Sequence, residues 1–499
     1  MQMKKILSNG MAAVVAQIVT IICGLILPRL ILDCYGSELN GLTQSIKQFL
    51  GLISFLDMGV GQVVRSALYQ PLSRKDHFQI SRIIVSGSRY YRTISHALLG
   101  YVAVLAVVYP ILVNGSYDWF FTVSLLIVMA ISSFAQYYFG IVNEQLLHAD
   151  QKSYLIYLTQ TFTNLANLAL CIWLIRMKAS IHAIKLTTSL VFVIKPLIYS
   201  VYIRRHYQID KTITYTEEPI KQKWYGISQH ISAVVLDGTD NVVLTFFSTL
   251  SNVSVYSVYY MVISSIQGLY QSATMGIQSA AGALWARNDR EKIQEMFFSV
   301  EYVLHVVTVF LFCCTGILIV PFVRVYTDGL TDAEYIQPMF AAFLVLAYGI
   351  RSLRTPYNIW ILAAGHFKQT QRCHITAAAI NLIISVIAVS RWGLIGVAIG
   401  TLIAMCYQTT WMAFYTIRNL IKCSVAHILK QAIADVTTVV LVCFIAVRID
   451  MQTVSYLDWA FMALKVAMIT AGGIFVISML FYRKQTVQLL KGIVQKICK

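Results

Sequence analysis

GSELNGLTQSIKQFLGLISFLDMGVGQVVRSALY, residues 36–69, is long and apolar enough to cross a bilayer, yet it carries Lys47, Asp57 and Arg65. At about 100° of turn per residue, Lys47 and Arg65 fall on one side of a helix and most apolar residues on the other. Asp57 lies roughly 80° from that cationic side and balances one of the two charges. A charge within a membrane span indicates a functional site by default. The alternative is that both cations lie near the membrane surfaces and extend into water.

The composition is that of a membrane protein. Of 499 residues, 58% are hydrophobic and 12% are charged, whereas about a quarter of the residues of a soluble domain are charged. Windows of about 20 apolar residues recur along the chain, and we count about fourteen of them. The longest polar break, residues 204–225, is too short for a separate domain. We therefore expect an all-α integral membrane protein of about 14 transmembrane helices.

Basic residues are concentrated in every second loop of the chain. The net charge is +17, but this charge does not indicate nucleic-acid binding, because it gathers in the loops of one side. The other side carries only Lys178 and Arg391. The positive-inside rule then predicts that both termini are cytoplasmic. The basic side includes Lys4, Lys5, Arg74, Lys75, Arg204, Arg205, Arg290, Lys292, Lys368, Arg372, Arg483 and Lys484.

Two similar halves are predicted from the order of spans, short loops and basic loops. The basic loop SRKDH after the second span matches ARNDREK after the eighth. Paired bundles around a central site are common in transporters. We predict an N-terminal six-helix lobe (1–203), a cytoplasmic linker (204–225), a second six-helix lobe (226–417), and two additional helices with a cytoplasmic tail (418–499).

Cationic residues within or at the edge of the predicted spans outnumber the acidic ones. A cavity lined in this way favours an anion such as a phosphate, because an uncompensated charge in a low dielectric is costly. Arg351 and Arg354, one turn apart, could hold such a group at two points, and Asp57 and Glu301 would balance part of the charge. The alternative is that each cation reaches the surface or pairs with a carboxylate. The cationic candidates are Arg29, Lys47, Arg65, Lys185, Lys195, Arg351 and Arg354.

Asp237 and Asp240 form a second candidate site, in the span that begins near residue 226. Two carboxylates at this spacing can hold a sodium ion with amide and carbonyl oxygens, or share a proton. The alternative is a salt bridge to Arg351 or Arg354. The sequence contains no phosphate-binding G-x-x-x-x-G-K, no H-E-x-x-H and no G-x-S-x-G, so we expect a transporter and not an enzyme.

Three stretches resemble the polysaccharide exporters of the multidrug, oligosaccharidyl-lipid and polysaccharide exporter superfamily. They are YGSELNGLTQSIKQFLGLISFLDMGVGQVVRSALYQPLSRKD (35–76), RTPYNIWILAAGHFKQTQ (354–371) and INLIISVIAVSRWGLIGVAIGT (380–401). The resemblance implies two pseudo-symmetric six-helix bundles that face each other in a V, plus two C-terminal helices, in the bacterial cytoplasmic membrane. It also implies alternating access to the two sides of that membrane.

The implied cargo is an oligosaccharide linked to undecaprenyl pyrophosphate, flipped outward for O-antigen, capsule or exopolysaccharide assembly. Membrane lipids surround such a protein, and a polysaccharide polymerase and a chain-length regulator are the implied protein partners. No cofactor is implied.

The related lipid II flippases hold a cation between the helices that correspond to the spans of Asp237 or Asp240, Asn381 and Thr401. One turn after the asparagine, where those relatives have another acid, this chain has Ser385. The coupling ion, Na⁺ or H⁺, and an uncoupled cycle therefore stay open.

Two other functions compete with the flippase. One is a cation-coupled multidrug antiporter of the same fold, whose usual cationic substrates this cavity would repel. The other is a membrane polysaccharide polymerase, which the short outer loops disfavour.

Overall fold

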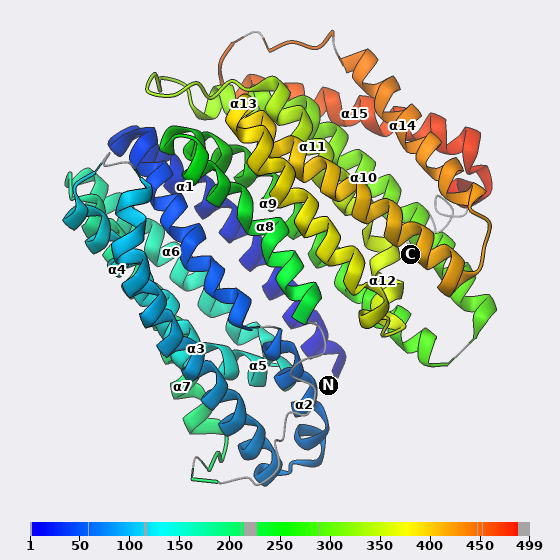
Figure 1. Ribbon diagram of the computed structural model, residues 1–499. Coiled ribbons are helices and arrows are strands. Elements are labelled where there is room, and N and C mark those ends of the chain that lie inside the picture. Colours follow the sequence, from blue (N-terminus) through cyan, green and yellow to red (C-terminus); the bar gives the residue numbers. More distant parts are fainter. Residues whose placement is uncertain are drawn as a thin grey trace. The chain divides into compact units, whose positions relative to one another are not determined.

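The computed structural model describes residues 2–57, 59–113, 117–210, 212–213, 227–287, 289–446, 448–451 and 453–487. Within these ranges the chain forms helices and no strands (Figure 1), which confirms the predicted all-α class. The first part of the chain forms α1 (Gln2–Gly51), η1 (Leu52–Asp57), α2 (Val60–Arg74), α3 (His77–Leu112), α4 (Trp119–Ala135), η2 (Gln136–Gly140), α5 (Ile141–Ala149), α6 (Ser153–Arg176), α7 (Ile181–His206) and α8 (Ile227–Phe247). It continues with α9 (Leu250–Ala286), α10 (Arg290–Tyr326), α11 (Pro338–Leu353), α12 (Thr355–Ala363), α13 (Phe367–Tyr415), η3 (Thr416–Ile421), α14 (Ala426–Ala446) and α15 (Tyr456–Phe481).

The helices group into two compact units, residues 1–254 and 255–499, so the boundary falls in the second turn of α9. Helix α8, which the sequence analysis assigned to the second lobe, packs against α1 in the first unit. Most of the predicted linker, residues 204–225, lies outside the described residues from residue 214 on. The predicted lobe boundaries therefore stay a prediction.

Nine helical stretches of the described residues are long and apolar enough to span a membrane. Two of them, Asn9–Asp57 with 49 residues and Phe367–Ile421 with 55 residues, are longer than one span requires. At about 1.5 Å per residue each exceeds 70 Å, more than twice the roughly 30 Å of a bilayer core. Each stretch therefore accounts for two of the predicted spans.

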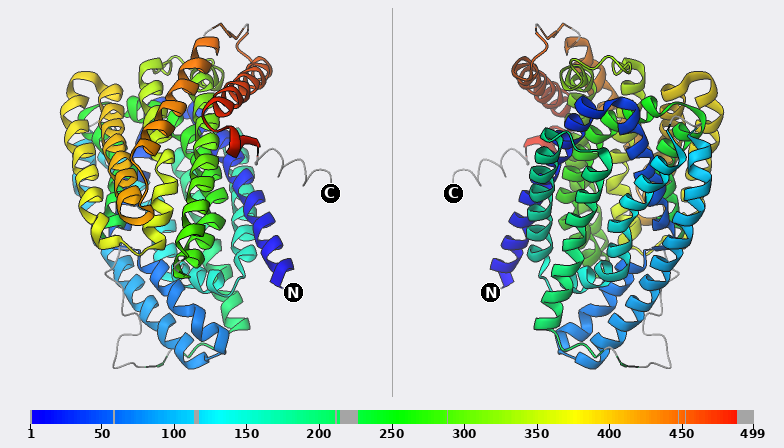
Figure 2. Two further views of the ribbon diagram at one scale, coloured as in Figure 1. Left: turned by 90° about the vertical axis from the view of Figure 1, so that its right-hand side faces the viewer. Right: turned by 90° about the vertical axis from the view of Figure 1, so that its left-hand side faces the viewer.

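Helix α1 reverses its direction at Gly36, where φ is 80° and ψ is 172°. Its first half runs from Asn9, whose amide donates to the carbonyl of Gln151 before α6, to Tyr35, whose hydroxyl donates to the carbonyl of Ala179 after α6. Glycine adopts such a positive φ without steric cost. Figure 2 shows this helix in blue, from the N-terminus upward and then back. The stretch 36–69 therefore begins at this reversal.

Helix α13 reverses in the same way at Gly393, with φ 51° and ψ −124°. The two arms pack so closely that a Cβ on Gly400 would lie 2.2 Å from Ser385 Oγ. Close backbone approach through small residues is typical of helix pairs in membranes. The predicted spans of Asn381 and Thr401 are thus the two arms of this hairpin.

The second predicted span differs from the prediction of one helix over residues 36–69. Helix α1 ends at Gly51, η1 is a 3₁₀ turn, and Gly59 before α2 has a left-handed backbone with φ 75°. The count of 100° per residue holds only in a continuous α-helix. Lys47 and Arg65 lie on different helices. The prediction that they share one face of a single helix is therefore wrong.

Large apolar side chains point outward along the helices. Ile111, Phe120, Phe444 and Leu480 each expose more than 70% of their surface, while Tyr109 and Leu42 are fully buried between helices. Soluble monomers rarely expose apolar surface on this scale, whereas lipid tails accept it. This distribution agrees with an integral membrane protein.

Candidate functional site

Two predicted cations of the first unit act electrostatically on each other. Lys47 on α1 is exposed and Lys185 on α7 is half-buried, and the charge of Lys47 repels that of Lys185. Within the described part of the chain, no carboxylate pairs with either group. Two cations that repel each other without a carboxylate partner favour a bound anion.

The other predicted cations of this unit have local partners. Arg29 Nη2 lies 3.1 Å from Asp33 Oδ1 one turn later. Lys195 Nζ lies 4.5 Å from the centre of the Phe192 ring and is attracted by Glu144. These contacts are consistent with both interpretations of the sequence, a lined cavity and local charge pairing.

Asp57 and Arg65, which flank the break at Gly59, have separate surroundings. The hydroxyl of Tyr91 donates to Asp57 Oδ1. Arg65 Nε is buried and has no hydrogen-bond partner among the described residues. The role of Asp57 as a balance for Lys47 or Arg65 stays a prediction.

Arg351 and Arg354 stand where α11 ends and α12 begins. Arg351 Cζ lies 5.8 Å from the centre of the Tyr348 ring, one turn earlier on α11. The guanidinium of Arg354 acts electrostatically on His374 of α13. Their joint binding of one anion stays a prediction.

The predicted ion-coupling residues are placed in part. In the α13 hairpin, Asn381 Nδ2 donates to Thr401 Oγ1 at 3.0 Å, and both residues are fully buried. Asp240 on α8 is buried at 2% exposure, and the side chain of Asp237 lies outside the described residues. The structure thus joins Asn381 to Thr401, as their assignment to neighbouring spans implies.

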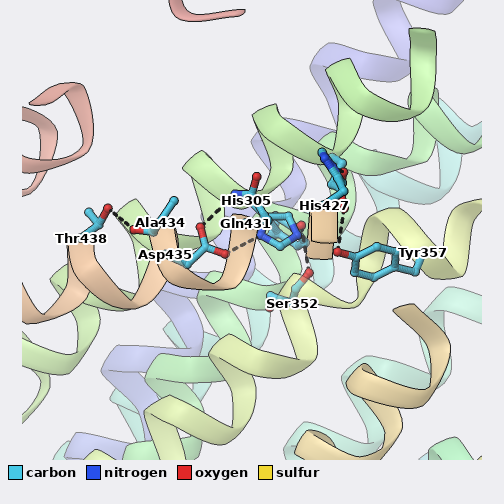
Figure 3. Close-up of polar contacts among 10 residues, drawn as sticks. His305, Ser352, Tyr357, His427, Gln431, Ala434, Asp435 and Thr438 are labelled. Atoms are coloured by element: carbon cyan, nitrogen blue, oxygen red, sulfur yellow. Dashed lines mark hydrogen bonds and ion pairs between the residues drawn. The ribbon is translucent and has the colours of Figure 1, made fainter. Parts of the chain in front are cut away.

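A buried polar cluster in the second unit joins α10 to α14 and α12. Glu301 Oε1 accepts from the hydroxyl of Tyr357 at 2.7 Å, and its Oε2 lies 2.5 Å from His427 Nε2. One turn along α10, His305 Nδ1 lies 2.6 Å from Asp435 Oδ2. Figure 3 shows His305 and Asp435 facing each other, with His427 and Tyr357 beside them. Glu301 is 1% exposed, so its carboxyl group depends on these two contacts for its hydrogen bonds.

Sequence analysis named Glu301 but missed its partners on α14. His427, Gln431 and Asp435 follow each other at intervals of four residues, and Glu301 and His305 have the same spacing on α10. Residues four apart share a helix face. Two polar faces of otherwise apolar helices are a signal that such helices pack together, because buried polar groups need partners.

Sequence analysis also missed a cavity of about 550 Å³ in the first unit. Its walls come from α3, η2, α5 and α7 and include Arg89, Arg92 and Arg204. The signal was the spacing of Arg89, Arg92 and His96 on α3, which places the three on one helix face.

Comparison with known proteins identifies the fold. No family model matches the sequence, and no curated protein sequence matches it significantly. The structure is similar to that of the lipid II flippase MurJ in an inward closed conformation, with a TM-score of 0.72, 16% sequence identity, and coverage of 94% of this chain and 98% of that chain. An inward-facing multidrug resistance MATE family transporter of the MOP superfamily matches with a TM-score of 0.58, 15% identity, and coverage of 81% and 94%.

A MOP superfamily transporter from Pyrococcus furiosus matches with a TM-score of 0.61, 13% identity, and coverage of 84% and 97%. At these identities the likeness shows the fold alone. The chain is an all-α, multi-pass membrane protein with the fold of MOP superfamily transporters.

Proposed function

We propose that this protein is a flippase that moves an oligosaccharide linked to undecaprenyl pyrophosphate across the bacterial cytoplasmic membrane. The observation that carries the proposal is the proximity of Lys47 and Lys185 in a chain with the fold of a lipid II flippase. Two like charges without a carboxylate favour a polyanion, and a pyrophosphate offers several acceptor oxygens to ammonium donors.

In this proposal the cationic residues hold the pyrophosphate while the lipid tail stays in the bilayer. The two units open alternately to the two sides, and both termini are cytoplasmic. The cycle is coupled to Na⁺ or H⁺ through Asp237, Asp240, Asn381 and Thr401, or runs uncoupled. A polysaccharide polymerase and a chain-length regulator would receive the exported unit.

Transport of a fluorescent undecaprenyl-pyrophosphate oligosaccharide in proteoliposomes tests the proposal. The assay compares the wild type with Lys47→Gln and Lys185→Gln, with and without a Na⁺ or pH gradient. Loss of one charged hydrogen bond is expected to slow transport about 10-fold to 100-fold. Lys178→Gln, which removes an exposed charge in the turn between α6 and α7, is the matched control and should transport normally.

Equal transport by Lys185→Gln and Lys178→Gln would contradict the role of the cationic pair. No transport by any variant, including the folded wild type, would contradict the flippase itself.

The second candidate function is multidrug export, which the likeness to a MATE transporter favours. A cationic drug would meet the repulsion of Lys47 and Lys185, so we expect no drug resistance in cells that produce the protein. Resistance that persists in the Lys47→Gln variant would favour this second function.

A further inference from the structure

The cavity of the first unit is strongly cationic. It has a volume of about 550 Å³ and is lined by arginines of α3 and α7, with polar side chains of α5 and α7 between them. None of its lining residues is acidic. The polar and basic residues of the lining include Arg89, Arg92, His96, Asn143, Ser200 and Arg204.

Two described carboxylates on or just after α5, Glu144 and Asp150, have partners of their own. Helices α3 and α7 contain no Asp or Glu. Glu144 on α5 accepts from Gln136 Nε2 at 3.1 Å and attracts Lys195. Asp150, after α5, accepts from the hydroxyl of Tyr207 at 2.5 Å and pairs with Lys152 at 2.9 Å. Among the described residues, the lining of the cavity therefore contributes the positive charges of Arg92 and Arg204 and no negative charge.

One wall of the cavity is aromatic and comes from η2. The π-helical turn η2 places Tyr137 and Tyr138 in its wall, and such turns are frequent at functional sites. Arg92 Cζ lies 5.3 Å from the centre of the Tyr138 ring, which positions the guanidinium without neutralising it. Asn143 Nδ2 donates to Ser200 Oγ at 3.0 Å and ties α5 to α7.

The cavity lies at the level where membrane lipids carry their phosphates. Helix α3 has 36 residues, about 54 Å at 1.5 Å per residue, which exceeds the roughly 30 Å of the bilayer core. Its uncharged stretch, apart from one histidine, runs over residues 94–112, so Arg89 and Arg92 come just before the core begins. Arg204 occupies the last turn of α7, just after its apolar stretch ends.

This is also the end of the first unit that carries the basic loops. The backbone N–H of Asp210, just after α7, donates to Ser81 Oγ on the first turns of α3 at 3.1 Å, so these two ends lie side by side. The positive-inside rule predicts that this end is cytoplasmic.

We propose that this cavity binds the phosphate or pyrophosphate group of a membrane lipid in the cytoplasmic leaflet. Arg92 and Arg204 donate to the phosphate oxygens, Tyr137 and Tyr138 cover the headgroup, and the acyl or isoprenoid chains stay in the bilayer. The ligand is a bulk anionic phospholipid or the carrier lipid of the proposed transport. The site goes beyond the proposed function, because a lipid phosphate binds here whether or not that lipid is moved.

Lipid binding to the full-length protein in detergent tests the proposal, by native mass spectrometry with three probes. These are phosphatidylglycerol, undecaprenyl pyrophosphate, and a diacylglycerol with the same acyl chains as the phosphatidylglycerol but no phosphate. The variant Arg92→Gln with Arg204→Gln is expected to bind phosphate-bearing lipid about 10-fold to 100-fold more weakly than the wild type. The matched control is Arg82→Gln with Arg205→Gln, which removes two arginines of the same helices that do not line the cavity.

Weaker binding of both phosphate-bearing probes supports a general site for anionic lipid. Weaker binding of undecaprenyl pyrophosphate alone supports a carrier-lipid site. Equal binding by the two double variants, or equal binding of phosphatidylglycerol and diacylglycerol to the wild type, would overturn the proposal. The comparison of phosphatidylglycerol with diacylglycerol uses the wild type, so it tests the proposal even if the Arg92 variant fails to fold. None of these binding measurements depends on transport.

Discussion

Replacement of Glu301 by alanine removes the centre of the buried cluster between α10, α12 and α14. The carboxylate is 1% exposed and has two contacts, the hydroxyl of Tyr357 at 2.7 Å and His427 Nε2 at 2.5 Å. A hydrogen bond to a charged group contributes about 1.5–3 kcal/mol, and the loss of both contacts, with Tyr357 and His427 left buried without their acceptor, costs about 3–5 kcal/mol. We therefore expect Glu301→Ala to lower the free energy of unfolding by about 3–5 kcal/mol.

Thermal unfolding of the purified protein in detergent measures this loss. For a unit of this size, about 2–4 °C is expected per kcal/mol, so the midpoint should fall by about 6–20 °C. Glu295→Ala, an exposed carboxylate on the same helix, is the matched control and should change stability by about 0.5 kcal/mol or less.

A double-mutant cycle with His427→Ala separates the pair from the cavity left by the side chain. Two residues in contact should couple by about 0.5–3 kcal/mol. A shift for Glu301→Ala no larger than that for Glu295→Ala, or a coupling near zero, would refute the view that this cluster fixes α14 to α10.

Three further predictions test other parts of the fold. A Cβ on Gly473 would lie 2.7 Å from a side chain of α14, whereas one on Gly472 meets open space. By thermal unfolding, Gly473→Ala should lower the free energy of unfolding by about 1–3 kcal/mol, and Gly472→Ala should raise it by about 0.5–1 kcal/mol. Thr401→Val removes the acceptor of the buried Asn381 amide and should cost about 1–3 kcal/mol in the same assay; no loss would contradict the pairing. The pKa of Asp289, the N-cap of α10, lies below its ordinary value because the lysine three residues later donates to it. The stability advantage of wild type over Asp289→Ala should therefore hold near neutral pH and vanish as the pH falls through that lowered pKa. An advantage that is independent of pH would contradict this.

Residue patterns along the chain determined the class of protein and its spans. Runs of about 20 apolar residues must satisfy their backbone groups internally in lipid, which requires helices. The reversals at Gly36 and Gly393 fall where polar residues and glycine interrupt the apolar runs. Asn381 and Thr401, which the resemblance assigned to a coupling-ion site, lie on the two arms of one hairpin and are in contact, and the ion site stays a prediction.

Partners from distant helices were decided only by the tertiary structure. Periodicity tells which residues share a helix face, but not which other helix that face meets. Glu301 meets His427, and Lys47 approaches Lys185, across more than a hundred residues of chain. The break at Gly59, which separates Lys47 from Arg65, was likewise missed. A left-handed backbone at one glycine costs little free energy, so Gly59 permits the break between η1 and α2 but does not require it. The contacts of α2 with α3 and α5 exist only in the folded chain, and they favour the break.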